Sequence, residues 1–554
     1  MKNFLISVTP LFNNFKETKI PGYMISSTAS INVEGDEINQ EMQSFSDPLI
    51  TIKQIAEYIY KSSCQGKNIE IITQIHGFNT PYRNSKKMYC EANEWIQNNV
   101  AIDSNSQLIL FCYCWPSEGM KLLAWYQAYR ALPLWLQIFM WMGLLIGFLN
   151  GLYVSVVNPS NYFLGILCAI VAVAFITPVI TLMFLRLSTY FRDSYRANNY
   201  GIVDLIQFFK AFEQELFNVI EVKHETAKNY WNNNRIKLSF IGHSMGGFVV
   251  TNVIRSLSDV FDKNLITSLE IEEDYNFDKP STSKVGDCFC LERLILVSPD
   301  IPLDSILSGR SNFLVSSLIR FQECYLFSNE GDIVLLMAST AANYFIYPAK
   351  TSQKGYKLGN LGLRADGIDS SSKRKYGIVN LFDKMHPESF NQSVFNRLVI
   401  GVDHSFVFEK INNPSKANNK ICSKIQCIEK IAEQFTYFDC TDYDYKQGTK
   451  SSKKSDLNLL DYVKLTIRYF SHSQNIYRDV HGGYFMGEFT KCAIYKLAFL
   501  GMKPYLSSFK QFLEYPRESK DKALTTEDYK RLDVELKKHN IRVLLKPTLL
   551  PSPK

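Results

Sequence analysis

A serine between two glycines follows an apolar run and precedes a segment with helical periodicity. Residues 242–247 read Gly-His-Ser-Met-Gly-Gly, and the apolar run before them extends from Leu238 to Ile241. When G-x-S-x-G joins a strand to a helix, the sharp turn presents the serine hydroxyl above the edge of a sheet. The N–H of Met245, at the start of that helix, then faces the position where an oxyanion forms. The pattern therefore predicts that Ser244 is a nucleophile.

A second loop carries residues suited to the same chemistry. Residues 76–80 read His-Gly-Phe-Asn-Thr and directly follow a strand-like run, Glu70 to Ile75. Glycine lets the backbone approach a ligand closely, so we expect the N–H of Phe78 to be the second oxyanion donor. We interpret His76 as a residue that anchors this loop rather than as a catalytic base.

The two motifs together resemble those of the α/β-hydrolase superfamily. Trp-Pro-Ser-Glu-Gly at residues 115–119 and Ser-Pro-Asp at residues 298–300 narrow the resemblance to an uncharacterised bacterial branch of serine hydrolases. The resemblance covers residues 69–500. It implies an α/β-hydrolase fold, activity of the lipase or esterase type, and a catalytic triad in the chain order Ser, then Asp or Glu, then His. It requires no metal or organic cofactor.

The acid of such a triad has three candidates. Asp332 follows the strand-like run that ends at Phe327 and precedes a helical segment, which is where the superfamily places its acid. Asp300 follows the preceding strand-like run and is the second candidate. Glu330 is the third. We favour Asp332.

The base has two candidates among the histidines beyond the acid. His481 opens the sequence His-Gly-Gly-Tyr-Phe, ahead of a helical segment, and a flexible loop at that place suits a general base that must reach a serine. His404 also follows a strand-like run, Arg397 to Ile400. We favour His481 over His404. The remaining histidines after the acid are expected in solvent: His386, His472 and His539.

Short apolar runs alternate with segments of helical periodicity along most of the chain. This alternation predicts an α/β fold with a mostly parallel sheet flanked by helices. The strand-like runs are Phe4–Val8, Ile69–Ile75, Leu108–Cys114, Ile236–Ile241, Leu291–Val297, Gln322–Phe327 and Phe435–Phe438. The helical segments are 53–60, 88–100, 202–220, 492–500 and 526–538.

One long region contains no charged residue and no histidine. It lies between Arg130 and Arg186 and divides at the turn cluster Asn-Pro-Ser-Asn, residues 158–161. At a rise of about 1.5 Å per residue, each arm is long enough to span a hydrocarbon core of about 30 Å. The region therefore predicts a transmembrane helical hairpin at residues 131–186. Aromatic and basic residues at both ends are typical of a membrane interface with the termini of the hairpin in the cytoplasm.

Composition sets limits on partners and compartment. The chain has 554 residues and a net charge of only +7, without a basic block, so we expect no nucleic-acid partner. The 12 cysteines do not follow the spacing of a zinc site and predict reduced thiols. The expected organisation has four parts: residues 1–130 with the oxyanion loop, the hairpin at 131–186, the rest of the hydrolase domain at 187–514, and a charged C-terminal extension at 515–554.

Two hypotheses follow. The first is a membrane-anchored serine hydrolase that cleaves carboxylic esters, of which lipids such as phospholipids are the favoured class, with the lipid bilayer as its partner and the catalytic domain on the cytoplasmic side. Fixing the site near a bilayer raises the local concentration of lipid substrate. The alternative is a non-catalytic membrane scaffold with a hydrolase fold, or a protein that perturbs membranes.

Overall fold

The computed structural model describes about half of the chain. The described residues are 4–12, 19–30, 47–100, 103–117, 189–220, 224–257, 284–302, 317–329, 331–332, 334–335, 357–364, 379–381, 398–400, 434–441, 443, 480–509 and 526–546, with single positions at 134, 138, 141, 145, 149, 153, 156, 305 and 314.

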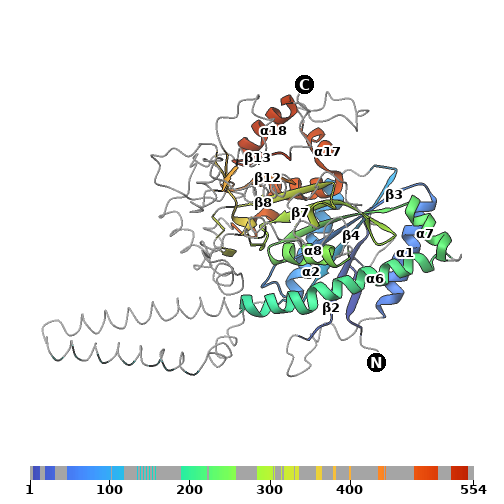
Figure 1. The fold of residues 1–554 in the computed structure, drawn as a ribbon, viewed down its shortest axis with the longest axis horizontal. Helices are drawn as coiled ribbons and strands as arrows, with labels where there is room; N and C mark the ends of the chain where they lie inside the picture. Colours follow the sequence, from blue (N-terminus) through green and yellow to red (C-terminus); the bar gives the residue numbers. More distant parts are fainter. Residues whose placement is uncertain are drawn as a thin grey trace, which may run out of the picture.

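A ten-stranded sheet forms the centre of the molecule (Figure 1). Its strands are, in spatial order, β1 (Ile6–Pro10), β2 (Gly22–Ser27), β4 (Ser106–Cys114), β3 (Asn68–Ile75), β5 (Ile236–His243), β7 (Phe289–Val297), β8 (Glu323–Ser328), β12 (Phe435–Asp439) and β13 (Arg542–Leu544), with β6 (Lys284–Val285) beside β7. All pairings from β2 to β12 are parallel, and β1, β6 and β13 pair antiparallel. Residues 363–364, 379–381 and 398–400 form a separate three-stranded sheet, in the order β11-β10-β9.

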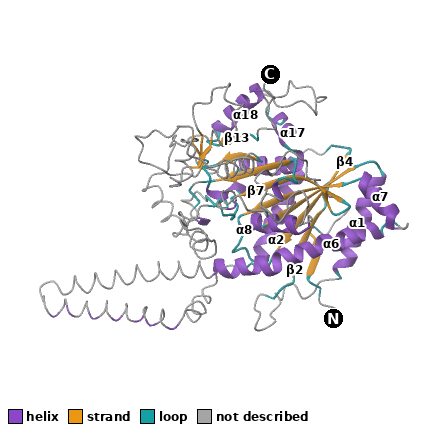
Figure 2. Cartoon of the chain, in the orientation of Figure 1, coloured by secondary structure: helices purple, strands orange, loops and turns teal. Residues whose placement is uncertain are grey.

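Helices cover both faces of the sheet (Figure 2). One face packs against α1 (Pro48–Cys64), α6 (Ile202–Asn218), α7 (His224–Asn233) and α8 (Met245–Leu257). The other packs against α2 (Tyr82–Asn99), α16 (Glu488–Leu500), α17 (Met502–Ser507) and α18 (Thr526–Lys538). The predicted α/β architecture with a mostly parallel sheet is therefore confirmed.

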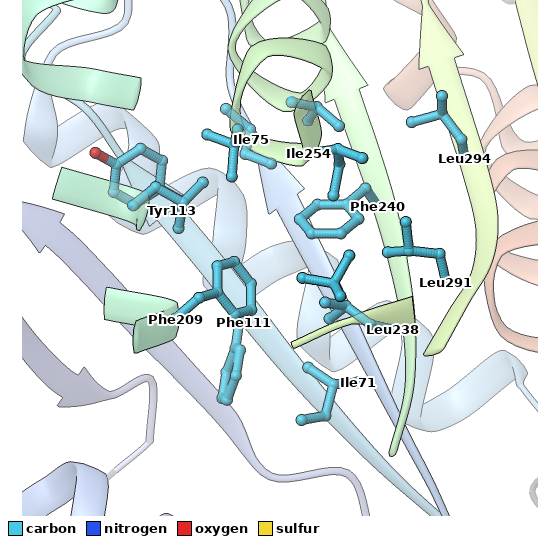
Figure 3. Packing of buried hydrophobic residues seen from close by; sticks show 14 of the residues in the cluster. Ile71, Ile75, Phe111, Tyr113, Phe209, Leu238, Phe240, Ile254, Leu291 and Leu294 are labelled. Carbon is cyan, nitrogen blue, oxygen red and sulfur yellow. The ribbon is translucent and has the colours of Figure 1, made fainter. Parts of the chain in front are cut away.

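Alternation along the central strands explains the two cores. On β4, Phe111 and Tyr113 belong to the core beneath α6, whereas Leu110 and Cys112 belong to the core beneath α2. Successive side chains of a strand point to opposite faces, so an uninterrupted apolar strand supplies both layers. Figure 3 shows the first core, in which Phe209 of α6 packs between the side chains of β4 and β5.

The segment expected as a charged C-terminal extension joins the main sheet. It contributes α18, whose Leu532 and Leu536 are fully buried, and the edge strand β13. β13 has only three residues and was not predicted, although residues 541–545 are mostly apolar.

The predicted hairpin lies outside the described residues except at seven positions. These seven are helical, large and apolar, and their side chains are exposed: Leu134, Ile138, Trp141, Leu145, Leu149, Tyr153 and Val156. Within the described part of the chain, none of the helices is both long and apolar enough to cross a membrane.

Candidate active site

Ser244 occupies the turn between β5 and α8. Its φ of +52° lies in the left-handed region, which a residue other than glycine adopts only when its surroundings hold it there. The Ser244 N–H donates to the carbonyl of Val297 at 2.9 Å, and the Ser244 carbonyl accepts from the N–H groups of Gly247 and Asp300, each at 3.0 Å. The predicted strand, sharp turn and helix are therefore present, and hydrogen bonds from β7 and its following loop fix the turn.

The glycines around Ser244 are required by close backbone contacts. A Cβ atom at Gly246 would lie 2.5 Å from the carbonyl oxygen of Ile75, and one at Gly242 would lie 2.7 Å from the Cα of Gly247. Because real Cβ atoms do not approach this closely, larger residues would force the turn apart. The GxSxG spacing thus reflects the tight packing of α8 onto β3 and β5.

The side chain of Ser244 is buried and its hydroxyl is unbonded. Ser244 has no exposed surface, and within the described residues its Oγ has no hydrogen-bond partner. Buried hydroxyl groups are normally paired, so an unpaired one at a strained turn is a feature of reactive sites rather than of packing.

His481 and Asp332 form a hydrogen-bonded pair at the same edge of the sheet. The His481 Nδ1 lies 2.7 Å from Oδ2 of Asp332, whose side chain is fully buried. The carboxyl group also accepts from the Ser298 hydroxyl through Oδ2 and from the Leu335 N–H through Oδ1 at 3.1 Å. These bonds stabilise the carboxylate and fix the orientation of the imidazole, which leaves Nε2 as the nitrogen that can exchange a proton.

His243 connects the base to the serine turn. Its Nε2 lies 2.9 Å from the carbonyl oxygen of His481, and the two rings are 5.0 Å apart. Burial, with a smaller effect of nearby His481, lowers the pKa of His243 to about 3, so this ring is neutral and donates Nε2–H to that carbonyl. The residue before Ser244 therefore positions the loop that carries His481, a contact between residues 238 positions apart that no sequence spacing indicates.

His76 anchors the second loop, as the sequence predicted. Its ring stacks on Trp115 with centroids 5.3 Å apart, and its carbonyl accepts from Trp115 Nε1 at 2.9 Å. Burial lowers the pKa of His76 to about 4, and its Nδ1 lies 2.6 Å from the carbonyl oxygen of Gly77. A neutral, fully enclosed imidazole is suited to structure and not to proton transfer at neutral pH.

The two expected oxyanion donors lie on the loops that meet at Ser244. A Cβ atom at Gly77 would be 2.8 Å from the Cβ of Ser244, so the peptide that carries the N–H of Phe78 lies against the serine turn. Met245 is the first residue of α8, where N–H groups have no acceptor within the helix. The ring of Phe78 is 6.5 Å from that of His481, which brings the second loop and the base into one site.

The side chains of the other candidate acids and bases either have other partners or lie outside the described residues. Asp300 forms a buried ion pair with Lys357, at 2.8 Å, rather than a contact with a histidine. Glu330, His386, His404 and His472 lie outside the described residues. His539, expected in solvent, is instead partly buried and stacks on Phe489 with centroids 3.8 Å apart.

The part of the chain that the structure describes contains no group of three or more His, Cys, Asp or Glu placed to hold a metal ion. Its nine described cysteines are all free thiols.

Comparisons with family models, with curated proteins and with solved structures found no match to this chain.

Proposed function

We propose that this protein is a serine hydrolase of the α/β-hydrolase superfamily that cleaves carboxylic esters through an acyl-enzyme intermediate. The observation that carries the proposal is the hydrogen bond at 2.7 Å between His481 and the fully buried Asp332. This pair lies beside the strained Ser244 turn although its two residues come from distant segments of the chain. The chain order Ser244, Asp332, His481 is that of the superfamily. In the superfamily, one oxyanion donor is the residue after the nucleophile and the other lies on the loop after an early strand, which correspond to Met245 and Phe78 in this chain.

In the first half of the reaction, the Oγ of Ser244 attacks the ester carbonyl carbon while Nε2 of His481 takes the hydroxyl proton. The N–H groups of Met245 and Phe78 donate to the oxyanion that forms. The bond from carbon to the alcohol oxygen then breaks, and His481 returns the proton to the departing alcohol. Asp332 stays ionised and stabilises the imidazolium.

In the second half, water replaces the alcohol. His481 takes a proton from the water as its oxygen attacks the acyl carbon, and the bond to Oγ breaks with return of a proton to Ser244. The products are an alcohol and a carboxylic acid, and no metal or organic cofactor is consumed. Because Ser244 has no exposed surface, we expect binding of the ester to displace the side chains that cover it.

We further propose that residues 131–186 anchor the enzyme in a lipid bilayer and that lipid esters, including phospholipids, are its substrates. The seven described positions of this segment are helical and carry large apolar side chains that are exposed. Soluble proteins rarely expose apolar patches of this extent, whereas lipid accommodates them. On this proposal the catalytic domain lies on the cytoplasmic side.

The activity is tested with detergent-solubilised full-length protein and a set of p-nitrophenyl esters. We expect wild type to hydrolyse them and to react with a fluorophosphonate probe, and Ser244→Ala and His481→Ala to do neither. His404→Ala is the matched control, because it removes a histidine that the sequence left as a candidate base. A folded wild type without either reaction would contradict the proposal and favour a non-catalytic scaffold. Loss of activity in His404→Ala with activity retained in His481→Ala would reassign the base.

A further inference from the structure

The loop that follows His76 is held by a buried carboxylate from a distant helical segment. Oδ2 of Asp193 accepts from the N–H of Asn79 at 3.0 Å and from the hydroxyl of Ser117 at 2.8 Å. The hydroxyl oxygen of Ser117 in turn accepts from the N–H of Thr80 at 3.0 Å. Two successive backbone N–H groups of the loop are therefore bound by two side chains that also bind each other.

Asp193 and Ser117 together form a clamp on the loop, and this clamp acts where the loop backbone is strained. Asn79, next to Phe78, has a φ of +58°, and a residue other than glycine keeps this conformation only when its neighbours enforce it. The hydrogen bond from the Asn79 N–H fixes the peptide that directly follows Phe78. A change at Asp193 is thus expected to reach the Phe78 N–H through a single residue.

Burial of Asp193 needs a reason beyond packing. Its side chain has no exposed surface, and an unpaired carboxylate there would be costly. Arg192 supplies two hydrogen bonds to Oδ1, at 3.0 and 3.1 Å, while Arg196 lies 3.9 Å from the same oxygen. The arginines thus engage Oδ1, and Oδ2 is the oxygen that binds Asn79 and Ser117.

The clamp also joins the two described stretches of chain that flank the inserted segment and form its base. Ser117 precedes residues 131–186 in the chain, and Asp193 follows them. Their hydrogen bond closes the base of the insertion directly against the loop that carries Phe78.

We propose that Asp193, together with Ser117, is a positioning residue that holds the Phe78 N–H in place as an oxyanion donor and ties this donor to the base of the inserted segment. The inference rests on the serine hydrolase function proposed above. Asp193 touches neither the substrate nor Ser244, so its effect on the reaction passes through the loop.

The test measures kcat and KM for p-nitrophenyl butyrate per active site, counted by fluorophosphonate titration of the full-length protein. Removal of an oxyanion donor lowers kcat by about 100- to 1,000-fold, and displacement of one should cost less. We expect Asp193→Ala to lower kcat by about 10- to 100-fold with KM within about threefold of wild type. Asp193→Asn, which keeps one acceptor oxygen, should lose less, and Ser117→Ala should lose kcat in the same manner.

Asp204→Ala is the matched control. Asp204 is likewise buried and accepts from a serine, Ser27, at 2.5 Å, but none of its described contacts reaches the oxyanion loop. We expect it to lower stability while kcat per active site stays within about threefold of wild type. If Asp193→Ala fails to fold, Asp193→Asn and Ser117→Ala still decide the matter.

Unchanged kcat per active site in both Asp193→Asn and Ser117→Ala, with an active wild type, would overturn this inference alone. The same result follows if Asp204→Ala loses as much kcat as the Asp193 variants, because the effect would then be general. A folded wild type that neither hydrolyses esters nor reacts with the probe overturns the proposed function and this inference with it.

Discussion

Polar side chains form a cluster at each end of the central strands, and the two clusters differ in how their polar groups are paired. In the amino-terminal halves of β3, β5 and β8 and near the middle of β7, Arg293 lies within 3.7 Å of carboxylate oxygens of Glu70, Glu292 and Glu323. Lys237 lies 3.2 Å from Glu292. At the carboxyl ends, the hydroxyl of Ser244 lies beside the His481–Asp332 pair and has no hydrogen-bond partner in the described part of the chain.

Backbone strain separates the two ends further. Among the described non-glycine residues, positive φ occurs at Asn79, Ser244, Ser298 and Asn540, and the first three lie at the carboxyl ends of β3, β5 and β7. The amino-end cluster instead pairs opposite charges with one another, and Arg293 also donates to the carbonyl groups of Ala498 and Phe499. Within the described residues, Arg293 Nε and Glu292 Oε2 have no hydrogen-bond partner. We infer that buried charges paired with one another serve the structure, whereas a nucleophile on a strained backbone beside a histidine–carboxylate pair serves chemistry.

The largest loss of activity is expected from a substitution at the carboxyl ends of the strands, Asp332→Asn. Asp332→Asn keeps the shape of the acid but no longer fixes the required tautomer of His481, so we expect kcat to fall by about 10,000-fold. Hydrolysis of p-nitrophenyl esters and thermal unfolding measured side by side provide the check. Wild-type kcat in the variant would remove Asp332 from the triad, and Asp300→Asn is its control.

At the amino ends of the strands, we expect a substitution to lower stability and to leave kcat nearly unchanged. Arg293→Met leaves the carboxylates of Glu70, Glu292 and Glu323 without their shared cation, and removal of one partner from a buried ion pair costs about 3–5 kcal/mol. We expect this loss in the free energy of unfolding from urea titration, with kcat per labelled active site within about threefold of wild type. A variant of unchanged stability but reduced kcat would reverse the contrast between the two ends.

Acid should weaken the fold through the buried imidazole of His76. The pKa of His76 is lowered to about 4 in the folded protein. Below pH 6.5 the unfolded chain therefore binds a proton that the folded chain does not. Stability from this residue is complete above pH 6.5 and declines as the pH falls toward 4.

Between pH 8 and pH 5, His76 should account for about 2 kcal/mol of lost stability. His76→Gln lacks this contribution, so its free energy of unfolding should fall by about 2 kcal/mol less than that of wild type over the same interval. Comparison of the two proteins cancels the opposing effect of buried carboxylates such as Asp204, whose pKa is raised to about 6 by burial. Parallel pH profiles for the two proteins would contradict a neutral His76.

The smallest loss of activity is expected from a substitution at His243, which positions the His481 loop. His243→Phe preserves a ring beside Phe485, 5.5 Å away, but removes the hydrogen bond to the His481 carbonyl. We expect kcat to fall by about fivefold with little change in KM, because loss of one hydrogen bond costs about 1 kcal/mol. An unchanged kcat would show that the His481 loop keeps its position without His243.

The sequence predicted what depends on local pattern. Strands such as Ser106–Cys114 and helices such as Ile202–Asn218 follow from apolar periodicity, and the Ser244 turn follows from its glycines and flanking runs. Asp332 and His481 were reached through chain order and resemblance. Asp193 and His243 were not predicted, because their contacts join residues 114 and 238 positions apart and no spacing rule connects such segments.

The site of covalent modification shows most directly whether Ser244 is the nucleophile. Full-length protein in detergent is treated with a fluorophosphonate, digested, and mapped by mass spectrometry, with Ser244→Ala treated in parallel. The account predicts a single adduct on the peptide that contains Ser244, absent from the variant and strongly slowed by Asp332→Asn. A natively folded wild type without an adduct, or one modified at another residue and equally so in Ser244→Ala, would contradict it.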